Sequence, residues 1–290
     1  MPDREQDAHV FAEHRRVLLG VAYRVLGSFA DAEDVVQESW LRWSARPSGE
    51  VHDPRGYLVR TTTRLAIDRL RREQTRRETY AGPWLPEPVV TDTDSVELAE
   101  SVSMAMLVVL ETLSPLERAV FVLREAFDFS YAEVAEATGR SETAVRQLAH
   151  RAKEHVASRR PRFDADPKAR RQVTERFLAA CQTADIATFM ALLAPDVTLV
   201  SDGGGQARSP RRPIFGADKV ARFFASTSSY PIPDPGFDIV QIGDGPGIIV
   251  TSGGTPITAI VLDLMDGQIA NIHLVANPAK LHGLRAAELD

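Results

Sequence analysis

The chain has 290 residues, of which 44% are hydrophobic and 26% are charged, and its formal net charge is −6 at pH 7. This length accommodates about two or three domains, and without a signal-peptide core or an apolar run of about 18 residues we expect neither a membrane-spanning nor a secreted protein. A single cysteine, Cys181, excludes an internal disulfide and fits a reducing compartment, so we expect a cytoplasmic location.

Two amphipathic helices are predicted in the N-terminal region. Residues 7–26 carry apolar side chains at helical spacing, and Gly27 ends that helix. The next helix begins near Asp31 with DAEDVVQESWLRW, in which Val35 and Trp40 belong to an apolar stripe and acidic residues occupy outward positions. Acidic residues in a first turn also stabilise a helix against its macrodipole, so capping alone is one explanation for them.

An arginine-rich helix follows. Asp53 and Pro54 predict its start, because proline is favoured at the first helical position, and the helix continues to about Arg77. Eight arginines lie between Arg55 and Arg77, against only two acidic residues. Asp68 can pair with arginines four positions away, which accounts for two of them and leaves the rest unpaired. This excess favours contact with nucleic acid.

Residues 79–103 differ from the segments around them, because they are acidic, rich in proline and poorly periodic. We interpret them as an interdomain linker. Trp84 is unexpected in a linker, since an aromatic side chain gains nothing from exposure to water, so we expect it to dock on another surface. Ser114 and Glu117 then predict a capping box, and the helix that follows is expected to pack against the next two helices.

Those two helices are predicted to form a helix-turn-helix. Ser130 and Glu133 make a capping box that starts the first helix, Gly139 ends it, and Ser141 caps the second. The polar face of the second helix presents Thr143, Arg146, Gln147, His150 and Arg151. Arginine and glutamine side chains reach base edges in a major groove, which favours DNA binding; an ordinary helical hairpin with a solvated face is the alternative.

The last part of the chain changes character. We expect one or two helices over residues 168–193, a strand near residues 196–200, a glycine run at residues 202–205 and a helix over 217–226. Four strand-like runs separated by Gly or Asp turns follow, at residues 237–242, 247–251, 257–264 and 268–275. Helices followed by an antiparallel meander predict a separate α+β domain.

The two basic regions lie in an acidic chain. Residues 55–77 carry a local excess of six positive charges, and residues 140–160 an excess of four. Because the net charge is negative, nonspecific attraction of the free protein to phosphates should be weak. A docking partner that orients the two basic regions would explain how an acidic protein binds DNA.

The order of these elements resembles the extracytoplasmic-function (ECF) sigma factors of bacterial RNA polymerase, over roughly residues 7–158. DAEDVVQESWLRW is similar to the family's polymerase-docking helix, DPRGYLVRTTTRLAIDRLRR to its −10 reader and YAEVAEATGRSETAVRQLAHRAKEHV to its −35 reader. The segment between the arginine-rich helix and the next core helix is too short for the middle domain of larger sigma factors. The expected fold is therefore two all-α sigma domains followed by an α+β domain.

The C-terminal part resembles the SnoaL-like cone that one subgroup of these sigma factors carries. That subgroup has WLPEP, DGGG and NPxKL motifs, which here are Trp84, Leu85, Pro86, Glu87 and Pro88; Asp202, Gly203, Gly204 and Gly205; and Asn277, Pro278, Ala279, Lys280 and Leu281. Ala279 replaces the acidic residue usual in the last motif. The resemblance implies that this extension contacts the sigma core and the linker through these motifs and regulates activity in cis.

The resemblance also implies a division of the chain and a role for each part. The implied segments are a region-2 domain, a linker, a region-4 helix-turn-helix domain and a regulatory domain, at residues 1–78, 79–104, 105–160 and 161–290. The implied partners are promoter DNA and core RNA polymerase, through its β′ clamp helices and β flap. Polymerase binding is assigned to Asp31, Glu33, Asp34, Gln37 and Glu38.

The two DNA sites need different chemistry. Capture of unstacked −10 bases requires a basic face and a pocket, which the resemblance assigns to the loop around His52 and to Asp53, Arg55, Arg60, Arg64, Arg71 and Arg72. A helix in the major groove suffices at −35, where the assigned residues are Ser141, Thr143, Arg146, Gln147, His150 and Arg151.

Two other classes of function stay open at this point. An enzyme could use Asp202, Tyr230, Asp263 or His273, but no paired carboxylates, metal-ligand spacing or nucleophile motif joins them, and turns explain both aspartates as well. We therefore expect no enzyme, no metal and no cofactor, while a cavity that senses a small molecule stays possible. A regulator that acts without polymerase is the other alternative, and it predicts tight promoter binding by the isolated protein.

Overall fold

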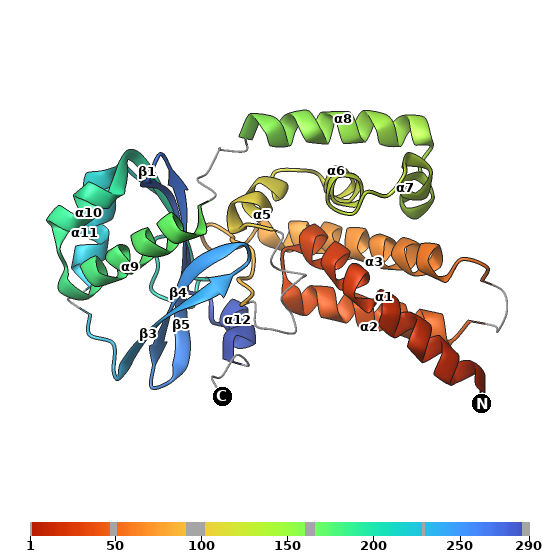
Figure 1. The fold of residues 1–290 in the computed structure, drawn as a ribbon, viewed down its shortest axis with the longest axis horizontal. Coiled ribbons are helices and arrows are strands. Elements are labelled where there is room, and N and C mark those ends of the chain that lie inside the picture. Colours follow the sequence, from red (N-terminus) through yellow and green to blue (C-terminus); the bar gives the residue numbers. More distant parts are fainter. Residues whose placement is uncertain (1, 47–50, 91–101, 160–165, 228–229, 286–290) are drawn as a thin grey trace. The chain divides into compact units, whose positions relative to one another are not determined.

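The computed structural model describes residues 2–46, 51–90, 102–159, 166–227 and 230–285. The chain divides into two compact units (Figure 1). The helical unit comprises Met1–Glu78 and Met106–Arg160, and the α+β unit comprises Thr79–Ala105 and Pro161–Asp290. No helix in these described ranges is both long and apolar enough to cross a membrane.

The first part of the helical unit consists of α1 (Pro2–Leu26), α2 (Phe29–Ser44) and α3 (Pro54–Arg77), which all contact one another. The helix expected near Asp31 begins earlier, because the Ser28 hydroxyl accepts a hydrogen bond from the Asp31 N–H at 3.2 Å and caps α2. Buried polar contacts fix α2 within the unit. The Ser39 and Thr62 hydroxyls lie 2.9 Å apart between α2 and α3, and Trp43 Nε1 donates to the Asp7 carbonyl at 3.0 Å.

The second part contains α5 (Met104–Leu110), α6 (Pro115–Phe121), a π-helical turn η1 (Val122–Ala126), α7 (Tyr131–Thr138) and α8 (Glu142–Arg159). Both predicted capping boxes are present, at Ser114 and at Ser130. Gly139 ends α7 with φ of +66°, a left-handed conformation that glycine adopts without strain. The predicted helix-turn-helix is therefore confirmed, and α6 packs against its second helix as expected.

The α+β unit has its strands in one mixed sheet. Its helices are α9 (Pro167–Thr183), α10 (Ile186–Leu192), α11 (Ala217–Thr227), α12 (Pro278–Leu281) and the 3-10 turn η2 (His282–Arg285). Its strands are β1 (Leu193–Asp202), β2 (Ile214–Phe215), β3 (Pro235–Ile242), β4 (Gly245–Ser252), β5 (Thr255–Met265) and β6 (Gln268–Val275). The strand order is β2-β1-β6-β5-β4-β3, and β1 pairs with β6 in parallel.

The two faces of this sheet have different neighbours. Helices α9, α10 and α11 cover one face, where Phe177, Phe189 and Phe224 form an aromatic cluster in the core (Figure 1). Side chains alternate along a strand, so Leu274 of β6 joins this core while His273 points to the other face. The α+β architecture expected from the sequence is confirmed.

Candidate functional site

The acidic residues of α2 lie at the surface of the helical unit. Asp34, Glu38 and their neighbours Glu33 and Gln37 are exposed, whereas Asp31 is partly covered. Three arginines pair with the acids of this face: Arg69 of α3 with Asp31 and Asp34, Arg15 with Glu33 at 3.0 Å, and Arg42 with Glu38 at 2.6 Å. Burial alone would lower the pKa of Arg69, but the carboxylates of Asp31 and Asp34 outweigh it and raise that pKa. The face is thus acidic, accessible and already engaged in surface ion pairs.

The arginines of α3 have more partners than the sequence indicated. Asp68 pairs with Arg71 at 3.2 Å, not with Arg64 or Arg72 as expected. Most of the remaining arginines also have partners, so the expectation that they are unpaired was wrong. The acidic partners are Asp31 and Asp34 for Arg69, Glu73 for Arg76, Glu111 for Arg77 and Glu136 for Arg60. Several of these partners lie on other helices, where the periodicity of one helix gives no sign of them.

Two arginines of the expected −10 face contact the helix-turn-helix. Arg60 forms an ion pair with Glu136, and Arg64 donates to the carbonyls of Glu136 and Ala137 at 3.0 and 3.2 Å. These carbonyls lie in the last turn of α7, which carries partial negative charge and attracts cations. Arg55 lies over the ring of Phe129 at 4.9 Å, and Asp53 caps α3 by accepting from the Gly56 N–H at 3.0 Å. The expected −10 face is therefore partly covered by α7 within the helical unit.

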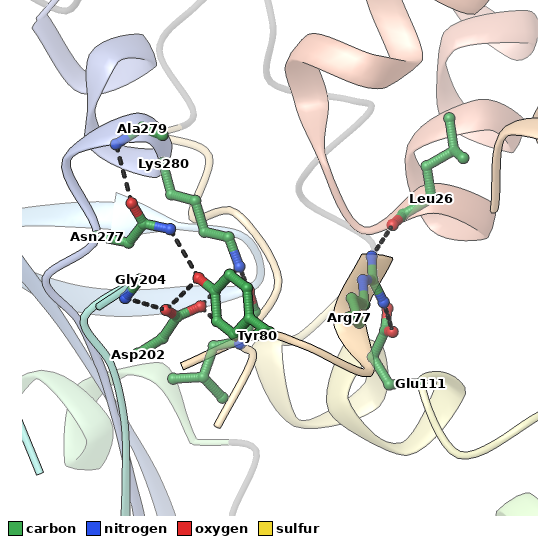
Figure 2. A network of polar contacts seen from close by, with 10 residues as sticks. Leu26, Arg77, Tyr80, Glu111, Asp202, Gly204, Asn277, Ala279 and Lys280 are labelled. Carbon is green, nitrogen blue, oxygen red and sulfur yellow. Dashed lines mark hydrogen bonds and ion pairs between the residues drawn. The ribbon is translucent and has the colours of Figure 1, made fainter. Parts of the chain in front are cut away.

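Arg77 belongs to a buried network rather than to an open basic face. Its guanidinium contacts Glu111 and the Leu26 carbonyl, as Figure 2 shows, and Glu111 also pairs with Arg118. Arg118 is almost fully buried and donates to the Arg24 carbonyl at 2.8 Å. Burial lowers the pKa of Arg118, although the Glu111 carboxylate opposes this shift. This network connects α1, α3, α6 and the turn before α6, so its role is structural.

The expected −35 face of α8 is exposed along its length. Arg146 pairs with Glu142 at 3.3 Å and lies over the Tyr131 ring at 4.4 Å. Longer contacts join His150 to Glu154 at 3.6 Å and Arg151 to Glu117 at 3.7 Å. Exposed pairs of this kind contribute about 0–1 kcal/mol, so a phosphate can replace their acidic partners at little cost.

Asp202, at the end of β1, holds the first part of the linker. One carboxylate oxygen accepts from the Tyr80 hydroxyl at 2.6 Å and from the Gly204 N–H at 3.0 Å (Figure 2). The other accepts from the Leu85 N–H at 2.9 Å and from Lys280 Nζ at 2.7 Å. Asp202 is fully buried, so four donors replace the water that its carboxylate loses.

Residues of α12 complete this arrangement. Asn277 donates to the Tyr80 hydroxyl at 2.8 Å, and Lys280 also donates to the Leu85 carbonyl. The Lys280 ammonium lies 3.7 Å from the centre of the Trp84 ring, a cation–π geometry. We call these residues the linker clamp: Tyr80, Trp84, Leu85, Asp202, Asn277 and Lys280. The expectation that Trp84 docks on another surface is confirmed.

The glycines after Asp202 allow the linker and α12 to pack closely against the end of β1. Gly204 and Gly205 both have positive φ, at +60° and +72°, which disfavours other residues. A Cβ on Gly204 would lie 2.5 Å from Asn277 Cγ, and one on Gly205 would lie 2.8 Å from Ala81 Cβ. A side chain at either position would therefore push the linker or α12 away.

Residues 79–90 are part of the α+β unit rather than a free tether. Leu85, Pro86, Glu87 and Pro88 are buried. Further along, Val90 bridges to Ile242 at the end of β3, and the Gly243 N–H donates to the Val89 carbonyl at 3.1 Å. Since β1 and β3 are four strands apart in the sheet order, this segment spans most of the sheet. The rest of the predicted linker, residues 91–101, lies outside the described residues.

The WLPEP, DGGG and NPxKL segments thus meet in one place. Sequence reasoning missed Tyr80, which bonds to both Asp202 and Asn277. Its position four residues before Trp84 was the available signal, since an isolated aromatic residue in a linker indicates a docking contact. Ala279, where an acidic residue is usual, contributes its backbone N–H to Asn277 Oδ1 at 3.1 Å.

The residues considered for an enzyme do not form one site. Asp202 is occupied by the linker clamp, and Tyr230 accepts a hydrogen bond from Arg208 at 2.7 Å. Asp263 is a buried strand residue that contacts His273 Nε2 at 2.7 Å, so its assignment to a turn was wrong. Within the described ranges, no cluster of His, Cys, Asp and Glu could hold a metal ion.

Comparisons with known proteins show the family to which the chain belongs. Residues 10–76 match the family model for sigma-70 region 2, and residues 103–156 match that for sigma-70 region 4. The chain is 40% identical to the ECF RNA polymerase sigma factor SigJ of Mycobacterium tuberculosis, over 94% of this chain and 92% of SigJ. It is 32% identical to the probable ECF RNA polymerase sigma factor SigI of the same species, over 94% of each.

The fold of the whole chain is also similar to a solved structure. The crystal structure of M. tuberculosis SigJ superposes with a TM-score of 0.74 and 36% identity, covering 97% of this chain and 98% of that one. Proteins of this family bind core RNA polymerase and promoter DNA, and they are not enzymes. The chain therefore belongs to the ECF sigma factors of RNA polymerase, which direct transcription initiation.

Proposed function

We propose that this sigma factor works in the cytoplasm, binds polymerase with the acidic face of α2, reads the −10 and −35 elements with α3 and α8, and is regulated in cis by its SnoaL-like α+β unit. The linker clamp is the observation that carries the regulatory part of this proposal. It ties the segment that follows the −10 reader to the α+β unit through buried contacts.

Polymerase binding is assigned to Asp31, Glu33, Asp34, Gln37 and Glu38, which lie on the outer side of α2. The clamp helices of the β′ subunit are the proposed target there, and the β flap is the proposed target of the helix-turn-helix. The ion pairs with Arg15 and Arg42 are exposed and contribute little, so a basic partner can displace these arginines from the carboxylates.

Charge reversal on α2 tests this assignment. Asp34→Lys with Glu38→Lys should abolish binding to core polymerase, measured by native gel shift or sedimentation. The matched control is Glu175→Lys with Asp218→Lys, because both residues are exposed acids paired with an arginine four positions away. Equal polymerase binding by the test and control variants would refute the assignment.

The −10 assignment requires a rearrangement. Asp53, Arg55, Arg60, Arg64, Arg71 and Arg72 are the proposed contacts. Two of them, Arg60 and Arg64, contact the end of α7, and a separation of α3 from α7 would free both for contact with a DNA backbone. We propose that polymerase binding drives this separation, because it is the step that aligns the two readers. The −35 contacts proposed for Ser141, Thr143, Arg146, Gln147, His150 and Arg151 need no such change.

We propose that the α+β unit regulates activity in cis because it holds the linker between the two DNA-reading regions. Region 2 and region 4 are joined by the linker, so fixing residues 79–90 to the α+β unit limits the positions that the two readers can take. The regulatory contacts that we propose are those of Trp84, Leu85, Pro86, Glu87, Pro88, Asp202, Gly203, Gly204, Gly205, Asn277, Pro278, Lys280 and Leu281.

Transcription by a reconstituted holoenzyme tests the regulatory role. Tyr80→Phe removes the hydroxyl that Asp202 and Asn277 share, while the ring and its packing stay. It should change the yield of start-site-specific RNA several-fold and leave the affinity for core polymerase unchanged. Thr183→Val is the control, since its hydroxyl donates to the Ala179 carbonyl at 2.9 Å within α9, outside the clamp. The regulatory role is wrong if both variants transcribe as the wild type does.

A further inference from the structure

The α+β unit contains a cavity of about 850 Å³ on the helix-covered side of its sheet. Apolar side chains make most of its wall, namely Phe223, Phe224, Ile232, Phe237, Ile260 and Leu274. This volume is in the range of sites that bind small organic molecules, which are mostly apolar with a few polar groups.

One positive charge lies at the mouth of this cavity. Arg208 and Tyr230 both line it and are exposed; Arg208 donates to the Tyr230 hydroxyl at 2.7 Å, and its guanidinium lies 3.7 Å from the ring centre. Among the described residues that line the cavity, Arg208 is the single charged one, and the described chain pairs it with the Tyr230 hydroxyl rather than with a carboxylate. An apolar chamber with one uncompensated guanidinium favours a ligand with an apolar body and one acidic group.

Neither Cys181 nor the His273–Asp263 pair supplies a reactive group to this cavity. Cys181 lines the cavity, and burial raises the pKa of its thiol to about 12, so the thiol stays protonated and unreactive at neutral pH. The His273–Asp263 pair lies on the opposite face of the sheet, as the alternation of β6 requires. The chemistry of the cavity is therefore that of a binding site.

A single loop belongs both to the cavity and to the linker clamp. We call residues 202–210 the glycine loop. Its first half contacts the linker through Asp202 and Gly205, and its last residues, Arg208, Ser209 and Pro210, line the cavity.

The glycine loop folds back tightly on itself. The Ala207 N–H donates to the Gly203 carbonyl at 3.0 Å, and the Ser201 and Ser209 hydroxyls are hydrogen-bonded. A Cβ on Gly203 would lie 2.6 Å from Ser209 Cβ. Because Ser209 packs this closely on Gly203, which directly follows Asp202, a movement of Ser209 reaches Asp202 through this contact.

We propose that the cavity binds an amphipathic organic anion, with a carboxylate or similar group on Arg208 and an apolar body among the aromatic side chains, and that the glycine loop transmits its presence to the linker clamp. This regulatory consequence rests on the cis regulation proposed above, whereas the binding site does not. The bound anion orders the loop and so stabilises the clamped state of the linker.

Calorimetric titration of the full chain tests the site, with decanoate, decanol and decyltrimethylammonium as probes. Decanoate should bind at one site and at least tenfold more tightly than the other two. Arg208→Gln should weaken decanoate binding about tenfold and leave decanol binding unchanged, because a charge-assisted bond contributes on the order of 1.5–3 kcal/mol and only part of it is lost. Arg222→Gln, an exposed arginine of α11 that pairs with Asp218, is the control and should bind as the wild type does.

Filling the cavity gives an independent check. Leu274→Trp should abolish binding of decanoate and decanol together, in protein shown by circular dichroism to be folded. If that variant does not fold, the result with Arg208→Gln decides alone, since Arg208 is exposed. Equal decanoate binding by Arg208→Gln and Arg222→Gln, or binding of decyltrimethylammonium as tight as that of decanoate, overturns the proposed site.

Hydrogen exchange tests the transmission. Saturating decanoate should slow amide exchange in residues 79–90 and 202–209 of the wild type several-fold, and should have no such effect in Leu274→Trp. Unchanged exchange in residues 79–90 at full occupancy overturns the transmission and keeps the binding site. If exchange slows but Tyr80→Phe transcribes as the wild type does, the site and its transmission hold, and the proposed cis regulation fails.

Discussion

The ion pairs on α8 and those in the linker clamp differ in their exposure to solvent. On α8 of the helical unit, the side chains of Arg146 and Glu142 are 59% and 50% exposed, whereas those of Lys280 and Asp202 in the clamp are 10% and 0% exposed. Exposed pairs contribute little to folding and are free to change partner, while breaking a buried pair leaves an uncompensated charge. The surfaces that we propose for DNA and polymerase thus carry exchangeable charges, whereas the contacts of the linker clamp are buried.

The buried network of the helical unit should give the largest effect on folding. Glu111→Ala leaves the buried guanidinium of Arg118 without its carboxylate, so the helical unit should lose about 3–5 kcal/mol of stability. Denaturant unfolding followed by hydrogen exchange of α1 and α6 measures this loss. Glu175→Ala, which breaks an exposed pair with Arg171, should cost less than about 1 kcal/mol. Equal losses would remove the contrast between buried and exposed pairs.

A substitution in the linker clamp that keeps the shape of the side chain should reduce stability by less than Glu111→Ala does. Asp202→Asn removes the charge that Lys280 faces and turns one acceptor into a donor, so the α+β unit should lose about 1.5–3 kcal/mol. Exchange should speed up in residues 79–90 and in α12. Asp218→Asn, an exposed acid of α11, is the control. Slow exchange in residues 79–90 of Asp202→Asn would show that the clamp does not hold the linker.

A substitution on the exposed face of α8 should weaken promoter binding without changing the stability of the fold. Arg146→Ala should change the stability of the helical unit by less than about 0.5 kcal/mol, since its ion pair is solvated. The same substitution should weaken promoter binding by the holoenzyme by about 1–3 kcal/mol, measured by gel shift on promoter and scrambled templates. Arg171→Ala is the matched control. Loss of stability without loss of promoter binding is the result that contradicts the assignment.

The capping box of α7 should give the smallest effect, and one that depends on pH. The Ser130 hydroxyl and N–H bond to the Glu133 carboxylate and lower its pKa. A depressed pKa in the folded state contributes stability above the ordinary glutamate pKa, and this contribution is lost as the pH falls through the lower folded value.

Ser130→Ala should therefore cost about 1 kcal/mol at neutral pH and less in acid. Thermal unfolding of this variant and the wild type between neutral and acidic pH measures the difference. A cost that stays the same across that range would show that Glu133 is not involved.

Local signals in the sequence predicted local structure well. Ser130 with Glu133, and Gly139 after them, were sufficient to place the helix-turn-helix, because capping and left-handed glycine conformations depend on near neighbours. The partners of the α3 arginines were not predictable in this way. Glu111 and Glu136 lie far along the chain on other elements, and no periodicity within α3 refers to them.

The linker clamp was only partly predictable for the same reason. The resemblance to a subgroup of the family indicated which three motifs to compare, but not that Asp202 accepts from both Tyr80 and Leu85. The acidic, proline-rich composition of residues 79–103 indicated an interdomain linker, of which the structure describes residues 79–90 and 102–103. In the structure, Asp202 and Lys280 hydrogen-bond to residues 79–90, and the end of this segment bridges to the edge strand β3.

The most direct test of the account is transcription from promoters that differ in the spacing between their −10 and −35 elements. Reconstituted holoenzyme with the wild-type chain should initiate efficiently at a narrow range of spacings, because the clamp limits where the two readers can lie. Asp202→Asn should initiate over a broader range, and Asp218→Asn over the wild-type range. Identical spacing profiles for all three proteins, with the clamp shown to be open in Asp202→Asn, would contradict the claim that the clamp controls promoter use.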